Sequence, residues 1–210
     1  FLLSLLLTVT FFACKSKSSG KNEQEQKETG LADSTTINVL PKDSVLKDFS
    51  KAVLTAFKNK DYTVLASLVH PDEGVRFSPY GYVDTLHDKI IKADWIVKQA
   101  GLKKQERILW GEFDGTGDPI NQTLDEYIKD FVYDVDFLHP EKSTVNQFLG
   151  AGNSPNNLAA IYPGLDFTES WFSGFDKRYE GMDWRSLRLV FKGKEGAYYL
   201  VAVIHDEWTI

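Results

Sequence analysis

Hydrophobic residues recur at helical spacing where the folded part of the chain is expected to begin. They are Val45, Leu46, Phe49, Val53, Ala56 and Phe57. Residues three or four positions apart share one face of an α-helix, so this spacing predicts an amphipathic helix over residues 44–58. Ser44 is the expected N-cap of this helix, because a serine hydroxyl accepts a hydrogen bond from the first free backbone amides.

Short elements follow in the middle of the chain. Asp61 is expected to cap a second short helix, and residues 75–78 alternate as a strand does. A third helix is predicted over residues 88–100, with Gly101 after it, and a strand is predicted over residues 107–113.

Turn residues and a capping box come next. Residues 114–119 read Asp-Gly-Thr-Gly-Asp-Pro, which is turn chemistry. Thr123 and Glu126 have the spacing of a capping box and predict a helix that runs to about residue 133. Residues 139–165 are rich in Asn, Gly, Pro and Ser and are expected to form the longest irregular stretch.

The C-terminal part of the chain reads as strands. Aromatic and β-branched residues dominate 166–172, 184–192 and 197–206, and residues 192–196 form a glycine-bearing hairpin connection. Isolated helices and strands followed by a three-strand meander predict an α+β fold, with an antiparallel sheet and helices packed on one face.

Composition narrows the class of protein. The chain has 210 residues, of which 42% are hydrophobic and 26% charged, values typical of a soluble globular domain. Cys14 is the single cysteine, so neither an internal disulfide nor a CxxC metal site can form. The net charge of −6 argues against a nucleic-acid partner, which needs a basic surface.

The first thirteen residues carry no charge and are mostly apolar. A run of this length is shorter than the roughly 20 residues that span a bilayer, and it matches the central part of a secretory signal peptide. We interpret residues 1–13 as a signal peptide trimmed at its N-terminus.

The sequence Phe11-Phe12-Ala13-Cys14 resembles a bacterial lipobox, although Phe11 stands where leucine is usual. The resemblance implies cleavage before Cys14 and acylation of its thiol, for example with palmitate, which would anchor the chain in a membrane. Lys15 is not the aspartate of the usual inner-membrane retention signal, so the resemblance favours the outer membrane, with the domain facing the periplasm or the cell surface.

Residues 14–44 are expected to form the lipidated cysteine and a flexible tether. The stretch after Cys14 has no aromatic residue and few apolar ones, so it buries too little surface to offset its ordering entropy. Ser34 and Ser44 stand in Asp-Ser-Thr and Asp-Ser-Val, which resemble a Bacteroidota O-glycosylation motif. A chance match of three residues is the alternative at both positions.

Two resemblances cover residues 45–210. The helical pair followed by His70-Pro71-Asp72-Glu73-Gly74-Val75-Arg76-Phe77, and the terminal meander, resemble the NTF2-like (cystatin-like) cone. Residues 110–120, 181–187 and 204–210 resemble a Bacteroidota-type lipoprotein family to which no activity is attached. The resemblances imply a single α+β domain, but cone folds host isomerases, dehydratases and non-catalytic binders, so the fold does not decide the function.

The connection before the strand at 184–192 is the expected rim of a ligand site. Aromatic residues there offer contact area, while Asp183 and Arg185 would orient polar groups. The other candidates are aromatic residues that could stack on a sugar and one histidine beside Asp206: Trp110, Trp171, Trp184, Trp208 and His205. Tryptophan in a strand is more often core, and His205 with Asp206 is more often a cross-strand polar pair.

Two further groups of polar residues have an ordinary structural interpretation. His70, Asp72 and Glu73 would serve as an acid–base pair or partial metal site, but a helix-ending turn fits them better. Residues 114–118 place oxygen ligands at alternate positions. Pro119 stands where an EF-hand needs glycine, so a surface turn is expected and a looser calcium site is the alternative. No motif predicts a cofactor or a resident metal.

These patterns favour a lipid-anchored, non-enzymatic domain that binds a small ligand or an envelope protein. The alternatives are an NTF2-like hydrolase or isomerase that uses an Asp or His inside the cone, and a structural protein of the envelope. An apolar cone interior would favour the binding protein, whereas a pocket with a carboxyl of raised pKa would favour the enzyme.

The lipid anchor is tested by the variant Cys14→Ala. We expect this variant to move from the membrane fraction to the soluble fraction, because the thiol that carries the acyl chains is gone. Fractionation that is unchanged in Cys14→Ala would refute the anchor.

Overall fold

The structure is a computed structural model that describes residues 40–150, 152 and 155–209. The predicted signal peptide, the predicted lipidation site Cys14, and Ser34 therefore lie outside the described residues. The helices are α1 (Lys42–Asn59), α2 (Tyr62–Leu68), α3 (Ala93–Ala100), α4 (Leu124–Phe131), α5 (Leu158–Ile161) and the 3-10 turn η1 (Lys177–Tyr179). The strands are β1 (Val75–Ser78), β2 (Lys89–Ile91), β3 (Ile108–Glu112), β4 (Pro119–Gln122), β5 (Lys142–Val145), β6 (Asp166–Phe172), β7 (Arg185–Lys194) and β8 (Ala197–Glu207).

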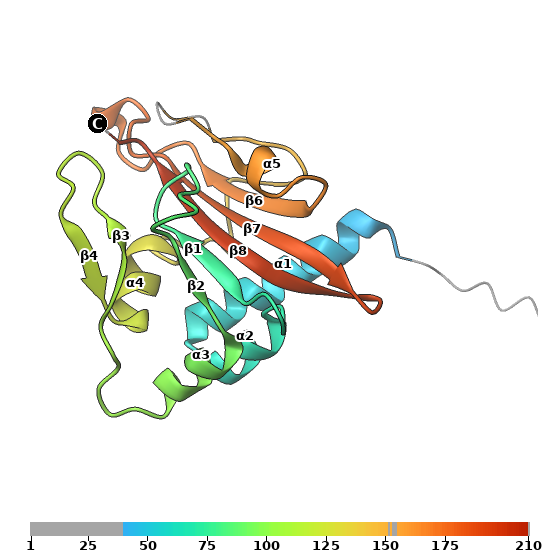
Figure 1. The fold of residues 1–210 in the computed structure, drawn as a ribbon. Coiled ribbons are helices and arrows are strands. Elements are labelled where there is room, and N and C mark those ends of the chain that lie inside the picture. The colour runs from blue at the N-terminus through green and yellow to red at the C-terminus, as the bar shows by residue number, and fades with distance from the viewer. Residues whose placement is uncertain (1–39, 151, 153–154, 210) are drawn as a thin grey trace, which may run out of the picture. The chain divides into compact units, whose positions relative to one another are not determined.

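The main sheet has six strands in the order β2-β1-β8-β7-β6-β5, and β3 pairs with β4 in a separate hairpin (Figure 1). The fold is therefore α+β, as predicted. The prediction of an antiparallel sheet was wrong at one place, since β1 pairs with β8 in parallel, with Phe77 opposite Val203. All elements from β2 to β7 lie between these two strands in the chain, and this long connection brings β8 alongside β1 in the same direction.

One face of the sheet packs against α1 to α4. Leu187, Leu189 and Phe191 of β7 point into this core, together with Leu200 and Val203 of β8. The prediction that helices cover a single face was also wrong. α5 packs on the opposite face, where Leu158 contacts a second cluster that includes Phe167 and Val190 (Figure 1). We call the face toward α1 the inner face and the face toward α5 the outer face.

Most local predictions are confirmed, with three corrections. Residues 139–165, expected to be irregular, contain the strand β5 and the short helix α5. Asp61 caps α2 and accepts a hydrogen bond from the Val64 amide at 3.0 Å, and Thr123 and Glu126 form the capping box of α4. The N-cap of α1 is Pro41 rather than Ser44, so the last residues of the predicted tether are already helical. The predicted helix over 88–100 is divided into β2 and α3, because residues 89–91 pair with β1 instead of continuing a helix.

A buried ion network holds the outer face together. Arg188 of β7 has no exposed surface, and its Nη2 lies 3.1 Å from Glu169 Oε1 and 2.8 Å from Asp206 Oδ2. The Gly150 carbonyl accepts a bond from the same nitrogen at 3.1 Å, and Ser186 donates to Glu169. Burial raises the pKa of Asp206, and Arg188 opposes this shift. The guanidinium thus balances two carboxylates that have little access to water.

Replacing this arginine leaves both carboxylates without their cation. We expect Arg188→Ala to lower the free energy of unfolding by about 3–5 kcal/mol, measured by urea denaturation. The matched control is Arg178→Ala, which removes an exposed arginine paired with Asp176 and is expected to leave the free energy of unfolding nearly unchanged, because water screens the pair. Equal effects of the two substitutions would contradict the role given to Arg188.

Candidate functional site

The inner face of the sheet is filled by side chains. Trp110 is fully buried and stacks on Tyr127 with ring centroids 4.2 Å apart, and Phe77 meets both rings edge-on. Trp110 is therefore a core residue and not a ligand contact. The interior along this face is therefore apolar.

Trp184 and His205 are also withdrawn from solvent. Trp184 packs closely against Gly150 and Gly152, where an added Cβ would lie 2.7 and 3.0 Å from its ring. His205 has no exposed surface, and its Nδ1 lies 3.3 Å from the Pro79 carbonyl while its Nε2 lies 3.4 Å from Asp134 Oδ2. Neither side chain reaches a ligand in this arrangement. Trp184 is buried, as expected of a tryptophan in a strand, but the expected polar pair of His205 with Asp206 is wrong, because Asp206 binds Arg188 while His205 faces Asp134.

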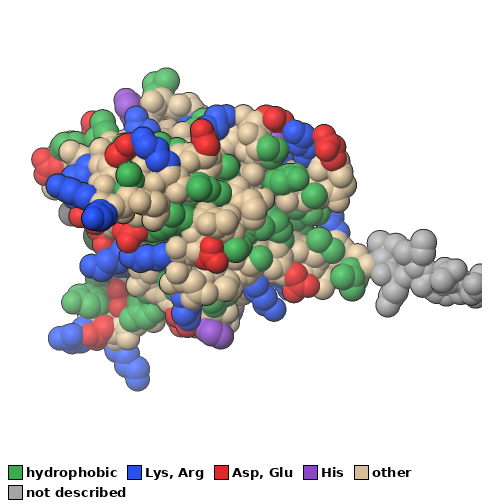
Figure 2. All heavy atoms as spheres, turned by 90° about the horizontal axis from the view of Figure 1, so that it is seen from below, with side chains coloured by type: hydrophobic (Ala, Val, Ile, Leu, Met, Phe, Trp, Pro, Cys, Tyr) green, Lys and Arg blue, Asp and Glu red, His purple; other side chains and the backbone are tan. Residues whose placement is uncertain are grey.

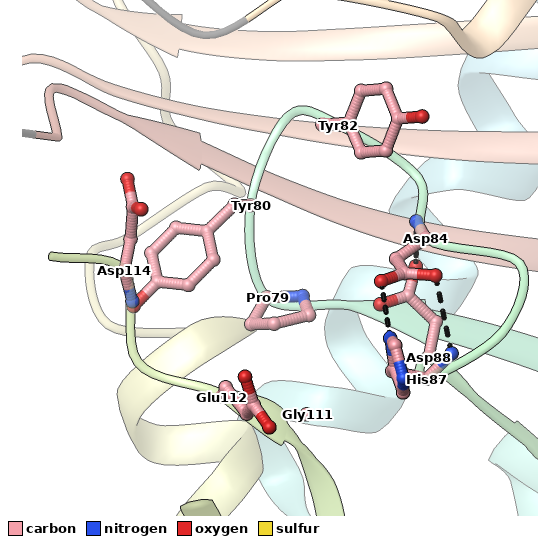
Figure 3. Close-up of a pocket in the computed structure, with 9 residues that line it drawn as sticks. All are labelled: Pro79, Tyr80, Tyr82, Asp84, His87, Asp88, Gly111, Glu112 and Asp114. Carbon is pink, nitrogen blue, oxygen red and sulfur yellow. Dashed lines mark hydrogen bonds and ion pairs between the residues drawn. The ribbon is translucent and has the colours of Figure 1, made fainter. Parts of the chain in front are cut away.

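A pocket of about 200 Å³ opens between the segment that follows β1 and the end of β3. In Figure 3, Pro79 and Tyr80 lie between two walls, with Asp84, His87 and Asp88 on one side and Glu112 and Asp114 on the other. Tyr82 and Gly111 complete its lining. We call it the acidic pocket, since four of its nine lining residues are aspartate or glutamate.

Asp88 is the most deeply buried carboxyl of the acidic pocket, with 9% of its surface exposed. Its Oδ2 accepts hydrogen bonds from the Ser78 hydroxyl and, at 2.9 Å, from the Asp84 amide. Burial raises the pKa of Asp88 to about 6, against the opposing effect of these bonds and of Arg76. Arg76 does not pair with the carboxylate, because its Nη1 donates to the carbonyl oxygens of Asp84 and Asp88, at 3.5 and 3.3 Å.

Asp84 and His87 form an ion pair at the mouth of the pocket. His87 Nδ1 lies 2.6 Å from Asp84 Oδ2, as the dashed line in Figure 3 shows. The hydrogen bond to His87 lowers the pKa of Asp84, and the same bond raises the pKa of His87. The cation of this pair is therefore already balanced by Asp84, and Asp88 has no ion-pair partner among the described residues.

Sequence reasoning missed this pocket. Asp88 falls in the helix predicted over residues 88–100, although Asp84, His87 and Asp88 are close in sequence. The spacing was a signal that a loop could bring these groups together. The opposite wall was not foreseeable in the same way, since Glu112 and Asp114 come from the β3–β4 hairpin.

The two predicted rim residues and one of the tryptophans predicted to stack on a sugar lie together beside the start of β7. Asp183, Arg185 and Trp208 line a second hollow, although Asp183 Oδ2 is engaged by the amides of Phe175 and Asp176 at 2.9 and 2.8 Å. Trp171 lies apart from them on β6, with the Lys142 ammonium 5.4 Å from its ring centroid.

The remaining polar candidates occupy turns. His70 Nδ1 accepts the amides of Asp72 and Glu73, at 3.3 and 3.2 Å, and these two acids pair with Lys194 and Lys192. Residues 114–118 form the turn of the β3–β4 hairpin. Within the described part of the chain, no three His, Cys, Asp or Glu side chains are grouped so as to hold a metal ion.

Comparisons of the chain with protein-family models, curated proteins and solved structures gave no match. Over residues 40–150, 152 and 155–209, no helix has both the length and the apolar character needed to cross a membrane. Figure 2 shows Lys and Arg side chains interspersed with Asp and Glu on the face seen from below. That face offers no continuous basic surface of the kind that nucleic acids bind.

The raised pKa of Asp88 makes a prediction about stability. Its folded pKa of about 6 exceeds the ordinary value of 3.8, so between these pH values the folded state binds more protons and stability falls as pH rises. Asp88→Asn keeps an oxygen for Ser78 and the Asp84 amide but removes the charge. We expect it to raise the free energy of unfolding by about 1–2 kcal/mol above pH 7, after allowance for solvent at the pocket mouth.

Urea denaturation across the pH range checks this expectation. Asp84→Asn is the matched control, because the pKa of Asp84 is lowered and its removal should not stabilise the protein. If Asp88→Asn is less stable than the original chain above pH 7, then the carboxylate is not the unfavourable buried charge described above.

Proposed function

We propose that this chain is a membrane-anchored lipoprotein whose folded domain binds a small organic cation in the acidic pocket without catalysing a reaction. The observation that carries the proposal is Asp88, a carboxyl nine-tenths buried in the pocket wall with no ion-pair partner among the described residues. A buried carboxylate is unfavourable without a cation, so a positively charged ligand gains binding free energy by pairing with it.

The lining of the pocket favours an organic cation over a metal ion. Glu112 and Asp114 lie across the pocket from Asp84 and Asp88 (Figure 3), so the negative charge is distributed around the cavity instead of converging on one point. This arrangement suits a ligand whose positive charges are several bonds apart. Tyr80 and Tyr82 add aromatic surface, which attracts ammonium and guanidinium groups.

The size of the pocket and the net charge support the same ligand class. A volume of about 200 Å³ is below the roughly 300–1,000 Å³ of pockets for drug-sized molecules, so the ligand is a small amine. The net charge of −6 attracts cations at long range.

The cellular location of the protein and its family membership are part of the same proposal. We infer that lipidation at Cys14 anchors the chain in the outer membrane, and that the domain is an NTF2-like cone of the Bacteroidota-type lipoprotein family. The lipobox resemblance supports the anchor. The helical pair α1–α2, the strand β1 after it and the terminal meander support the cone.

One observation favours a second function. A carboxyl with a pKa of about 6 in a pocket is suited to general acid–base chemistry near neutral pH, so Asp88 would serve a hydrolase or isomerase. Hydrolysis of p-nitrophenyl acetate that rises with pH through about 6 and is lost in Asp88→Asn would favour the enzyme. Absence of that activity, together with binding of a cation, favours the binding protein.

Binding is tested by calorimetric titration of the protein with 1,5-diaminopentane, beside the uncharged 1,5-pentanediol. We expect the diamine alone to bind, more weakly as salt is added, because carboxylates attract it through charge. Asp88→Asn should raise the Kd at least about tenfold, or about 1.4 kcal/mol.

Two controls make the titration decisive. Asp94→Asn removes an exposed carboxylate outside the acidic pocket and should leave the Kd unchanged. Circular dichroism verifies that each variant is folded. Equal binding of diamine and diol, or no binding of either, would contradict the proposed function.

A further inference from the structure

A second hollow, of about 320 Å³, lies where the β6–β7 connection meets the chain that follows β8. It is lined by Tyr179, Met182, Asp183, Arg185, Glu207 and Trp208, and we call it the aromatic rim. Tyr179, Met182 and Trp208 keep between 43% and 50% of their surface exposed. Large apolar side chains that share one exposed hollow mark an interaction site more often than single exposed ones do.

The polar part of the aromatic rim is held in a fixed geometry. Arg185 of β7 and Glu207 of β8 are opposite each other in the sheet, and Arg185 Nη2 lies 3.0 Å from Glu207 Oε2. Arg185 Nε also binds Asp134 Oδ2 at 2.9 Å, and its Nη1 donates to the Trp184 carbonyl at 3.0 Å. The guanidinium is thus oriented before any ligand arrives, which reduces the entropy lost on binding.

The connection that carries the aromatic side chains is also braced. Asp183 accepts two backbone amides of this segment, and a Cβ at Gly174 would lie 2.6 Å from its Oδ1. Gly174 has a φ of 137°, which favours glycine. The carboxylate of Asp183 therefore shapes the aromatic rim, whereas Arg185 and Glu207 are about one quarter exposed and face a ligand.

We propose that the aromatic rim binds a neutral sugar, at a site separate from the acidic pocket. A pyranose ring has an apolar face of C–H groups that packs on an aromatic ring, and hydroxyl groups around its edge. Each hydroxyl both donates and accepts hydrogen bonds, so it matches a pair in which Glu207 accepts and Arg185 donates.

Charge argues against an anionic ligand at this place. Among the described residues, Arg185 is the single cation that lines the hollow, and it is already paired with Glu207 and Asp134. An anion would have to compete with two carboxylates for the same guanidinium, whereas an uncharged polyol adds to the existing pair. A purely apolar ligand would leave this ion pair partly covered without new partners.

The experiment is a titration of tryptophan fluorescence with the methyl glycosides of glucose, galactose, mannose and N-acetylglucosamine. We expect at least one glycoside to change the fluorescence with a Kd of roughly millimolar size, as a small exposed site allows. Trp208→Ala and Glu207→Gln should each weaken binding at least about tenfold. Because Trp208→Ala removes a fluorophore, saturation-transfer NMR of the sugar protons provides the binding readout for that variant.

Trp171→Ala is the matched control, since Trp171 is a partly exposed tryptophan on β6 outside the aromatic rim, and sugar binding should persist in it. Thermal melting verifies that all three variants fold. The proposal is overturned if no glycoside binds, if Trp208→Ala binds as well as the original chain, or if glucuronate binds more tightly than methyl glucoside. None of these outcomes depends on whether a diamine occupies the acidic pocket.

Discussion

The parallel pairing of β1 with β8 is the constraint on which the rest of the structure depends. β8 is hydrogen-bonded on both sides, to β7 in antiparallel and to β1 in parallel orientation. The pairing carries the chain after Ser78 across the end of β8, where the Pro79 carbonyl lies 3.3 Å from His205 Nδ1. A Cβ at Gly81 would lie 2.6 Å from the Asp206 carboxylate. The wall of the acidic pocket is therefore built on the central strand.

Arg188 and Asp88 are both buried charged groups, but the desolvation of each is opposed in a different way. Arg188 lies between Glu169 and Asp206, so two ion pairs oppose its desolvation, and removing it would leave both carboxylates buried without a cation. Asp88 accepts hydrogen bonds from Ser78 and the Asp84 amide, but it has no ion-pair partner among the described residues. In our account the Arg188 ion pairs serve the fold. The Asp88 carboxylate lowers the stability of the fold and is retained because the proposed ligand supplies its cation.

Local features were predictable from sequence, and long-range ones were not. The cap at Asp61, the capping box at Thr123 and the β6 strand follow from residues near one another, and all are as predicted. The parallel β1–β8 pair and the side on which α5 packs depend on the path of the whole chain, which periodicity does not encode. Arg185 could be assigned to a rim from its neighbours in sequence. The burial of His205 and the environment of Asp88 could not be predicted, because they depend on the path of the chain.

The proposed function depends most directly on the protonation state of the Asp88 carboxyl group. Carbon-13 NMR of the Asp88 carboxyl, titrated with and without 1,5-diaminopentane, reports its pKa in the free and bound protein. We predict a pKa of about 6 without the diamine, and a fall toward the ordinary value of 3.8 with it, because a bound cation favours the charged form. A pKa near 3.8 in the free protein, or one that the diamine does not move, would contradict the account.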